Sequence, residues 1–336
     1  MKRPSLSGQG NLLFEAVFLL TALVVSFFFG QLRLRICEHF VTPEMFADMV
    51  NHVGNKPWQY RILVPEMASA LSHLKLPVSI SLFGWARWIE LGFMFLTVIA
   101  FRRYLDLFLK DRRVSAIMAF MIFLVLPFHV FFPRPYYANY WFDTPALLFL
   151  ILGLTFLYQK KWALYYVLFI VATLNRETTC FLTMIYLFTA LGRERFSRIA
   201  GHCAAQFVIW MSIKVVLGKM FAGNPGPDGF EWMDGSGVPH WLDNLRFFAK
   251  PSNVPAFLSM MGFLWIPVLC YYKRIDDVFV RRALWVIPPF MGGMFFVANI
   301  YELRIFAELI PVVLTPFLLI LTGLIKSQRP VAGDPG

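Results

Sequence analysis

Long apolar stretches are the feature of this sequence that most constrains its fold. A helix that crosses a bilayer needs about 20 apolar residues. Hydrophobic residues make up 58% of the 336-residue chain and charged residues only 15%, more apolar surface than a soluble domain of this length could bury. We therefore expect an all-α, polytopic membrane protein. Its clearest candidate spans are residues 11 to 30, 78 to 101, 114 to 132, 143 to 158, 199 to 222, 255 to 272, 283 to 299 and 307 to 325.

A further apolar stretch, residues 162 to 191, predicts a hairpin of two short helices. Asn175, Arg176 and Glu177 interrupt it in the middle. A single helix of this length would extend about 45 Å, beyond a hydrocarbon core of about 30 Å, and would bury the charges at mid-depth. With the hairpin, the chain has about ten transmembrane helices.

The charges predict how these helices are oriented. Of the 31 basic residues, 18 fall in short connections on one side, whereas 12 of the 20 acidic residues fall on the other. The positive-inside rule then places both termini in the cytoplasm and the long loops, residues 31–77 and 223–254, on the outer face. We expect one integral-membrane domain over residues 1–336, in a bacterial inner (plasma) membrane. The net charge of +11 belongs to membrane flanks, so nucleic acid is not an expected partner.

Two carboxylates follow the first apolar stretch. Glu44 and Asp48 are four residues apart in a helix predicted over residues 43 to 50, so they share one helix face. Repulsion between such neighbours raises the pKa of one of them, which suits a general base or a cation site. The alternative is a solvated helix face.

Asp143 begins the apolar segment 143 to 158 and is followed by Thr144 and Pro145. One interpretation is an N-cap, because an acid stabilises a helix start and proline is tolerated in the first turn. The other is a reactive carboxylate at the membrane surface. Its aromatic neighbours, equally suited to an interfacial belt or to stacking on a sugar, are Tyr136, Tyr137, Tyr140 and Trp141.

Arg176 and Arg304 are the candidate phosphate ligands. An arginine at membrane depth is costly unless it is paired, and the planar guanidinium matches a phosphate. Each has an acidic neighbour, Glu177 or Glu302, so a structural ion pair is the alternative. Arg61, beside Trp58 and Tyr60, is a third candidate. The side chains expected to line the substrate site are Tyr137, Tyr140, Trp141, Asn175, Glu177 and Glu302.

The histidines and cysteines match no metal-ligand spacing, and the chain has no glycine loop that would cradle a nucleotide phosphate. We therefore expect no metal site and no required cofactor, with dependence on a divalent metal left open. The loop 223 to 241, rich in glycine, aromatic and acidic residues, is either a lid over a site or a flexible connector.

Taken together, these motifs resemble the GT-C glycosyltransferases. The similarity lies in the acidic helix after the first span, the short basic inner loops, the stretch FDTPALLFLILGL at 142 to 154, the polar-tipped hairpin and the arginine–proline element at 301 to 311. The segment 143 to 162 is similar to the Asp-x-Pro helix start of aminoarabinose and mannosyl transferases. Two departures are that Glu44 and Asp48 are not adjacent and that the usual soluble C-terminal domain is absent.

The resemblance implies a function. A sugar would move from a polyprenyl-phosphate donor, the co-substrate, to an envelope glycolipid, glycan or protein acceptor on the outer face. It assigns Asp48 or Glu44 as the first-loop catalytic carboxylate and Asp143 as the acid near the donor, while Arg176 and Arg304 would neutralise the departing phosphate. An envelope polysaccharide polymerase or ligase and a lipid-linked glycan transporter are the alternatives. The expected partners are the lipid-linked donor and membrane lipid, and the sugar, the acceptor and the oligomeric state stay open.

Overall fold

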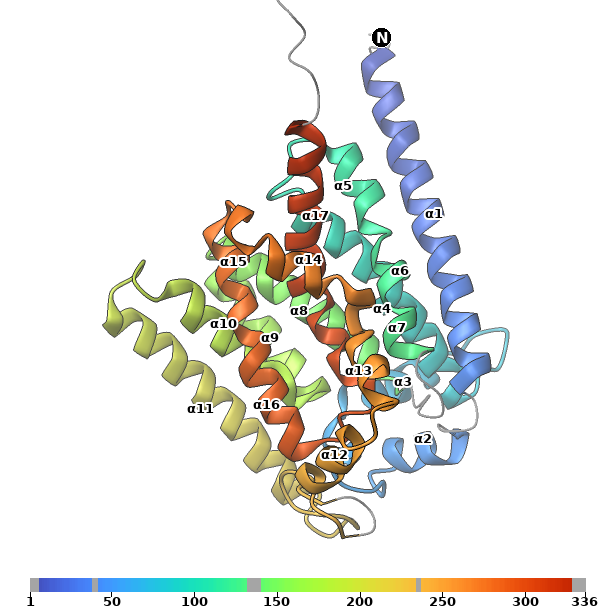
Figure 1. The fold of residues 1–336 in the computed structure, drawn as a ribbon. Helices are drawn as coiled ribbons and strands as arrows, with labels where there is room; N and C mark the ends of the chain where they lie inside the picture. Colours follow the sequence, from blue (N-terminus) through green and yellow to red (C-terminus); the bar gives the residue numbers. More distant parts are fainter. Residues whose placement is uncertain (1–5, 38–41, 132–139, 234–236, 328–336) are drawn as a thin grey trace, which may run out of the picture.

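The structure is a computed structural model that describes residues 6–37, 42–131, 140–233 and 237–327 (Figure 1). Over these residues the chain is helical. It forms no β-strand there, apart from an isolated bridge between Met233 and Pro239. The all-α prediction is therefore confirmed.

Many of the helices are short, and a few are long. The α-helices are α1 (Leu6–Cys37), α2 (Pro43–Val50), α3 (Leu63–Ser72), α4 (Leu82–Leu105), α5 (Arg112–Ala119), α6 (Ile122–Val125), α7 (Pro127–Val130), α8 (Asp143–Tyr158), α9 (Trp162–Asn175), α10 (Cys180–Ala190), α11 (Phe196–Met220), α12 (His240–Phe248), α13 (Asn253–Leu258), α14 (Trp265–Cys270), α15 (Val278–Ala283), α16 (Ile287–Val297) and α17 (Ile310–Ser327). The 3-10 helices are η1 (Trp58–Tyr60), η2 (Glu177–Thr179), η3 (Met260–Phe263), η4 (Tyr272–Arg274), η5 (Leu284–Val286) and η6 (Leu303–Leu309).

Five helices of the described chain are long and apolar enough to cross a membrane. They are Asn11–Arg33, Leu82–Leu105, Arg112–Val130, Phe196–Met220 and Leu303–Leu324. Helices α8 and α9 are apolar but have only 16 and 14 residues, and the predicted spans 255 to 272 and 283 to 299 are each divided into shorter pieces. Several apolar helices fit a membrane protein, while the full set of ten spans stays a prediction.

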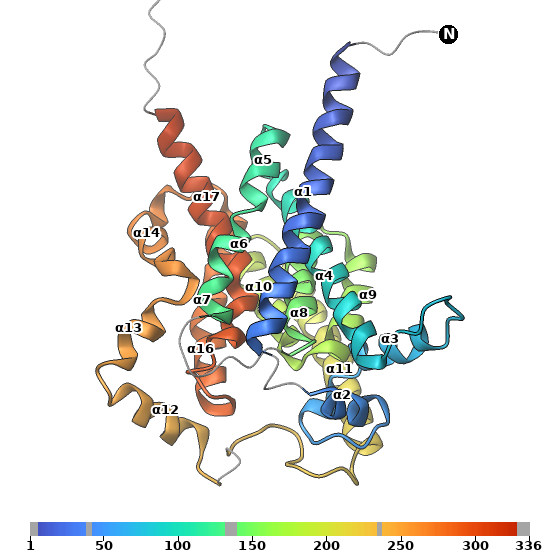
Figure 2. The same ribbon diagram turned by 90° about the vertical axis from the view of Figure 1, so that its right-hand side faces the viewer.

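The two ends of the molecule differ. The start of α1 and the end of α17 lie at the same end, and α2 and α12 lie at the opposite end (Figures 1 and 2). An even number of crossings requires this arrangement of the termini. Which end faces the cytoplasm stays a prediction.

The segment 162 to 191 reverses direction, as the hairpin prediction requires. At its open end, Lys160 Nζ lies 2.7 Å from Glu194 Oε1, and the rings of Trp162 and Tyr186 are 5.2 Å apart. The chain therefore turns back at its polar centre, and Arg176, only 4% exposed, lies at the buried tip.

The predicted span 255 to 272 is broken because its backbone turns left-handed at Met261, Gly262 and Phe263, with φ of 58°, 59° and 61°. His129 holds this break in place. Its Nε2 accepts from the Met261 amide at 3.1 Å, and its Nδ1 lies 2.8 Å from the Leu303 carbonyl, to which it donates. The histidine therefore has a structural role between η3 and η6.

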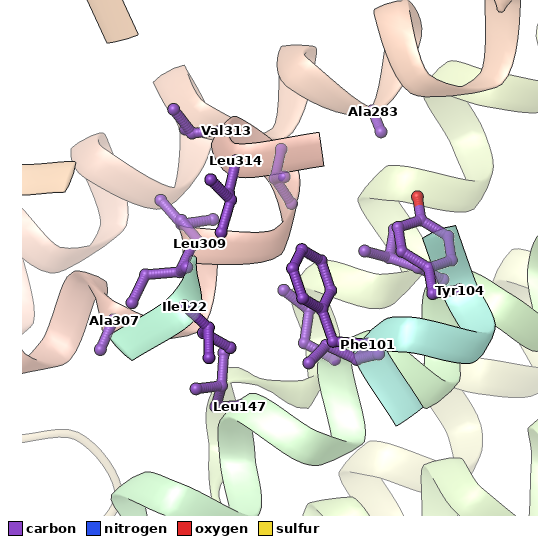
Figure 3. Close-up of a cluster of buried hydrophobic side chains, with 14 of the residues drawn as sticks. Phe101, Tyr104, Ile122, Leu147, Ala283, Ala307, Leu309, Val313 and Leu314 are labelled. Carbon is purple, nitrogen blue, oxygen red and sulfur yellow. The ribbon is translucent and has the colours of Figure 1, made fainter. Parts of the chain in front are cut away.

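The hydrophobic core gathers side chains from helices far apart in the sequence. Figure 3 shows Phe101 and Tyr104 of α4 near Leu147 of α8 and Leu314 of α17, all of them buried. Most of the last apolar span lies inside the protein, with 78% of it buried, against 22% of the first span and 17% of α11. The exposed apolar faces of α1 and α11 are suited to contact lipid.

Candidate functional site

A cavity of about 470 Å³ lies between the tip of the hairpin and α12. Its walls come from η1, the hairpin tip, α11, the loop before α12, the end of α16 and η6. The polar and aromatic residues that line it are Trp58, Arg61, Tyr140, Arg176, Glu177, Thr178, Cys180, Phe181, Trp210, Phe230, Glu231, Trp232, His240, Asn299, Glu302 and Arg304. Segments from both predicted loops and from the hairpin thus meet at one place.

Asp143 is the carboxylate that pairs with two of the arginines lining this cavity. Its Oδ1 lies 3.2 Å from Nη1 of Arg176 and 3.2 Å from Nη1 of Arg304, and its Oδ2 accepts from the Tyr140 amide at 3.1 Å. Phe142 occupies the capping position of α8 and makes no side-chain cap bond. The N-cap interpretation of Asp143 is therefore wrong, because its carboxylate is taken up by the arginines.

Arg176 is held by distant acids. Its Nη1 lies 2.7 Å from Glu308 Oε1, and the Thr178 hydroxyl donates to the same carboxylate at 2.8 Å. The alternative interpretation, a structural ion pair of Arg176, is found with these acids and not with its neighbour Glu177. The backbone at Arg176 is extended, with φ of −159° and ψ of 138°, so consecutive side chains point to opposite sides.

Arg304 pairs with its sequence neighbour Glu302, as the structural alternative predicted. The guanidinium carbon of Arg304 lies 4.4 Å from the centre of the Tyr140 ring. Arg61 takes the place beside Glu177 that the structural alternative gives to Arg176, at 2.8 Å, and lies over the Phe142 ring at 4.1 Å. The three candidate phosphate ligands are thus brought together.

We define the arginine cluster as Arg61, Arg176 and Arg304 with Asp143, Glu177, Glu302 and Glu308. Lys214 of α11 adds a fourth cation, 5.1 Å from the centre of the Phe230 ring. Formal charges of the four cations and four carboxylates cancel. Within the described residues, however, the Nε atoms of Arg176 and Arg304 have no hydrogen-bond partner, although both residues are at least nine-tenths buried. Unpartnered donors of this kind are costly and suit an anionic ligand.

Aromatic rings form another part of the wall. Trp58 stacks on Tyr140, with ring centres 6.2 Å apart and planes 19° apart. Trp210 stacks on Phe230 at 6.2 Å and donates from Nε1 to the Glu177 carbonyl at 2.8 Å. Aromatic faces beside carboxylates are a surface to which sugars can bind, because the rings stack on C–H groups and the acids accept from hydroxyls.

Two of the expected lining residues have structural roles instead. Asn175 donates from Nδ2 to the Phe142 carbonyl at 2.9 Å, which ties the hairpin tip to the start of α8. Trp141 packs on Phe46 of α2, with ring centres 4.9 Å apart. Neither is among the cavity-lining residues, whereas Tyr140, Glu177 and Glu302 are. Tyr137 lies outside the described residues.

Glu44 and Asp48 lie on α2, which spans the predicted residues, but both are exposed and neither lines the cavity. The helix buries its other side, Phe46 and Met49. Hydrogen bonds from its own backbone amide and from Thr42 lower the pKa of Glu44, so the upward shift expected of this pair is not found there. Their catalytic role stays a prediction.

Two lining residues, Glu231 and His240, were not among the predicted site residues. Both come from the segment 223 to 241, for which the sequence predicts either a lid or a connector. His240 is 2% exposed, and its Nδ1 lies 2.8 Å from Oδ1 of Asn299, a residue 59 positions away in the chain. No local pattern signals a contact of this range.

Burial raises the pKa of Glu231, and the nearby His240 and Arg61 oppose that shift only in part. A carboxyl whose pKa is higher in the folded state stabilises the fold only below its unfolded pKa and loses that contribution as pH rises through the folded pKa. We therefore expect Glu231→Gln to raise the thermal unfolding midpoint at neutral pH. The gain should vanish below the ordinary glutamate pKa, about 4.3. A midpoint difference that does not change with pH would contradict this.

No group of three or more histidine, cysteine, aspartate or glutamate side chains in the described part of the chain is arranged to hold a metal ion. Comparisons with protein-family models, with curated proteins and with solved structures find no match to this chain.

Proposed function

We propose that this protein is an integral-membrane glycosyltransferase whose donor is a polyprenyl-phosphate sugar. The observation that carries the proposal is the single cavity in which buried arginines, carboxylates and aromatic rings meet. The arginines are ligands for a phosphate, and the carboxylates and rings are ligands for a sugar. A substrate in which a phosphate is joined to a sugar at the anomeric carbon would contact the arginines, the carboxylates and the aromatic rings together.

The lipid part of such a donor has a place beside the cavity. An apolar groove of about 550 Å³ runs along α16 and α17, lined by residues such as Ile287, Met291 and Val313. Met294, on the next turn of α16, lines the cavity. Met291 and Met294 are separated by about 4.5 Å along the helix at 1.5 Å per residue. An isoprenoid chain could therefore lie in the groove while its phosphate reaches the arginine cluster.

The proposed reaction is a nucleophilic displacement at the anomeric carbon of the donor sugar. Arg304 and Arg176 stabilise the negative charge that builds on the departing phosphate oxygen, a form of electrostatic catalysis that is strong where water is excluded. Glu302, with a side chain 23% exposed, is the most accessible carboxylate of the arginine cluster, so Arg304 can exchange this carboxylate for a phosphate. On this proposal the cavity faces the outer side, where acceptors of the envelope are found.

The test is to incubate the purified protein with a panel of polyprenyl-phosphate sugars and a membrane glycolipid extract. We expect free polyprenyl monophosphate to be released together with a glycosylated product, and mass spectrometry detects both. The panel also holds polyprenyl-diphosphate sugars, and release of polyprenyl diphosphate from these donors alone would instead indicate a polymerase or ligase. No release from any donor would contradict transfer and favour a transporter.

A further inference from the structure

His240 is fixed between two parts of the chain at the edge of the cavity. It is the first residue of α12, its amide donates to the Trp232 carbonyl at 3.1 Å, and its Nδ1 meets Oδ1 of Asn299 at 2.8 Å. Asn244, one turn further along α12, donates to the Phe295 and Ala298 carbonyls and accepts from the Ile300 amide, each at 2.9 Å. These hydrogen bonds fix the position of His240 relative to Asn299.

The contacts of Asn299 determine which ring nitrogen of His240 carries the proton. Asn299 Nδ2 donates to Glu302 Oε1 at 3.4 Å, and an ionised carboxylate can only accept. The amide oxygen therefore faces His240, and Nδ1 must donate to it. In the neutral imidazole this leaves a lone pair on Nε2.

The Nε2 atom of His240 has no hydrogen-bond partner within the described residues. His240 lines the cavity, but Nε2 itself is buried, so a side chain of the wall must move before a ligand reaches this atom. A buried polar atom without a partner costs about 1 to 3 kcal/mol. His129, a buried histidine elsewhere, has a partner at each ring nitrogen. The unpartnered atom at His240 therefore points to a ligand group that donates a hydrogen bond.

We propose that His240 Nε2 accepts the proton of the hydroxyl that attacks the donor sugar. This inference rests on the proposed function and names the base for it. The acceptor oxygen forms a bond to the anomeric carbon as the bond from that carbon to the phosphate oxygen breaks. The phosphate leaves with the electron pair, and the hydroxyl proton moves to Nε2. A positioned base of this kind contributes about 100- to 10,000-fold to a rate.

The surroundings of the imidazole support this role. Glu231, from the loop before α12, lines the same cavity and interacts electrostatically with His240, so its carboxylate stabilises the imidazolium that forms. Glu302 lies behind Asn299, and the cations Arg61 and Arg304 lie on the same cavity wall, where they are paired with acids. The acceptor would thus sit between an acid-flanked base and an arginine-bound phosphate.

The experiment compares His240→Gln with the wild-type protein on a donor that the wild-type protein turns over. We expect kcat to fall about 100-fold while binding of polyprenyl phosphate is unchanged, because the arginine cluster is intact. A His240→Ala variant should regain part of its rate when imidazole is added, whereas a variant that is merely misfolded would not. Glu231→Gln is the matched comparison, with a smaller loss expected. An unchanged rate in His240→Gln, or a loss confined to Glu231→Gln, would overturn the assignment.

Asn299 is a positioning residue in this scheme, and its test does not depend on turnover. In ¹⁵N-histidine NMR spectra, with His240→Gln used to assign the signal, the neutral ring should carry its proton on Nδ1. Asn299→Leu should change that tautomer and lower kcat with little change in KM. Protonation at Nε2 in the wild-type protein would overturn the base assignment even if transfer is observed. Wild-type protein that turns over no donor would overturn the proposed function instead.

Discussion

Replacing Arg176 with methionine should lower the free energy of unfolding by about 3 to 5 kcal/mol, the range measured when one partner of a buried ion pair is removed. The side chains of Arg176, Asp143 and Glu308 are 5%, 7% and 6% exposed. Without Arg176, Glu308 keeps only the Thr178 hydroxyl among the partners found here, and Asp143 keeps Arg304. The measurement is the unfolding transition in detergent, followed by tryptophan fluorescence.

A second variant separates charge from packing. In the double variant Arg176→Met with Glu308→Met, no uncompensated charge is left at that position, and apolar replacements of a buried pair are often neutral. We expect the double variant to regain most of the lost stability. Arg87→Met, on the exposed side of α4, is the matched control and should change stability by less than about 0.5 kcal/mol. If the double variant is less stable than Arg176→Met alone, Arg176 is not acting through its pairing with Glu308.

The apolar periodicity and the bounds of some helices were readable from the sequence, but the cap of α8 was not, because Phe142 and not Asp143 occupies the capping position. Helices α2 and α8 have the predicted bounds, and the hairpin turns at Asn175 to Glu177 as expected. The broken segment near Met261 was not readable, because its left-handed turn is held by His129, more than a hundred residues away. Tertiary contacts of this kind override the local preference for a continuous helix.

The members of the site were easier to predict than their partners. Arg176, Arg304 and Arg61 were chosen because arginine at membrane depth needs a counter-charge, and the structure brings all three to one cavity. The ion-pair interpretation named the wrong partner for Arg176, because the nearest acid in sequence points to the opposite side of an extended backbone. Asn299 and His240 were not predicted as site residues, because neither belongs to a sequence motif. The role of a single asparagine or histidine depends on the group that it contacts in the fold.

Arg304→Gln should lower kcat/KM for lipid-linked donor about 1,000-fold, the upper end of the loss seen when one donor to a developing negative charge is removed. Arg304 is the cavity-lining arginine whose pairing with Asp143 and Glu302 leaves Nε free. The same variant should bind polyprenyl phosphate more weakly in a direct assay. Arg304→Lys keeps the charge but not the planar fork of donors, so its loss should be intermediate.

Glu302→Gln distinguishes a phosphate site from a structural ion pair. It removes the Arg304–Glu302 ion pair by changing the carboxylate and leaves the arginine in place. If Arg304 is there to bind phosphate, removing its competing carboxylate should leave lipid-phosphate binding equal or tighter, although catalysis can suffer through Asn299. If the pair is only structural, Glu302→Gln and Arg304→Gln should lower stability alike and change binding alike. Arg246→Gln, an exposed arginine of α12, controls for the loss of one positive charge at this end of the molecule. Equal binding losses in Arg304→Gln and Arg246→Gln would mean that the arginine cluster does not recognise the phosphate and acts only through net charge.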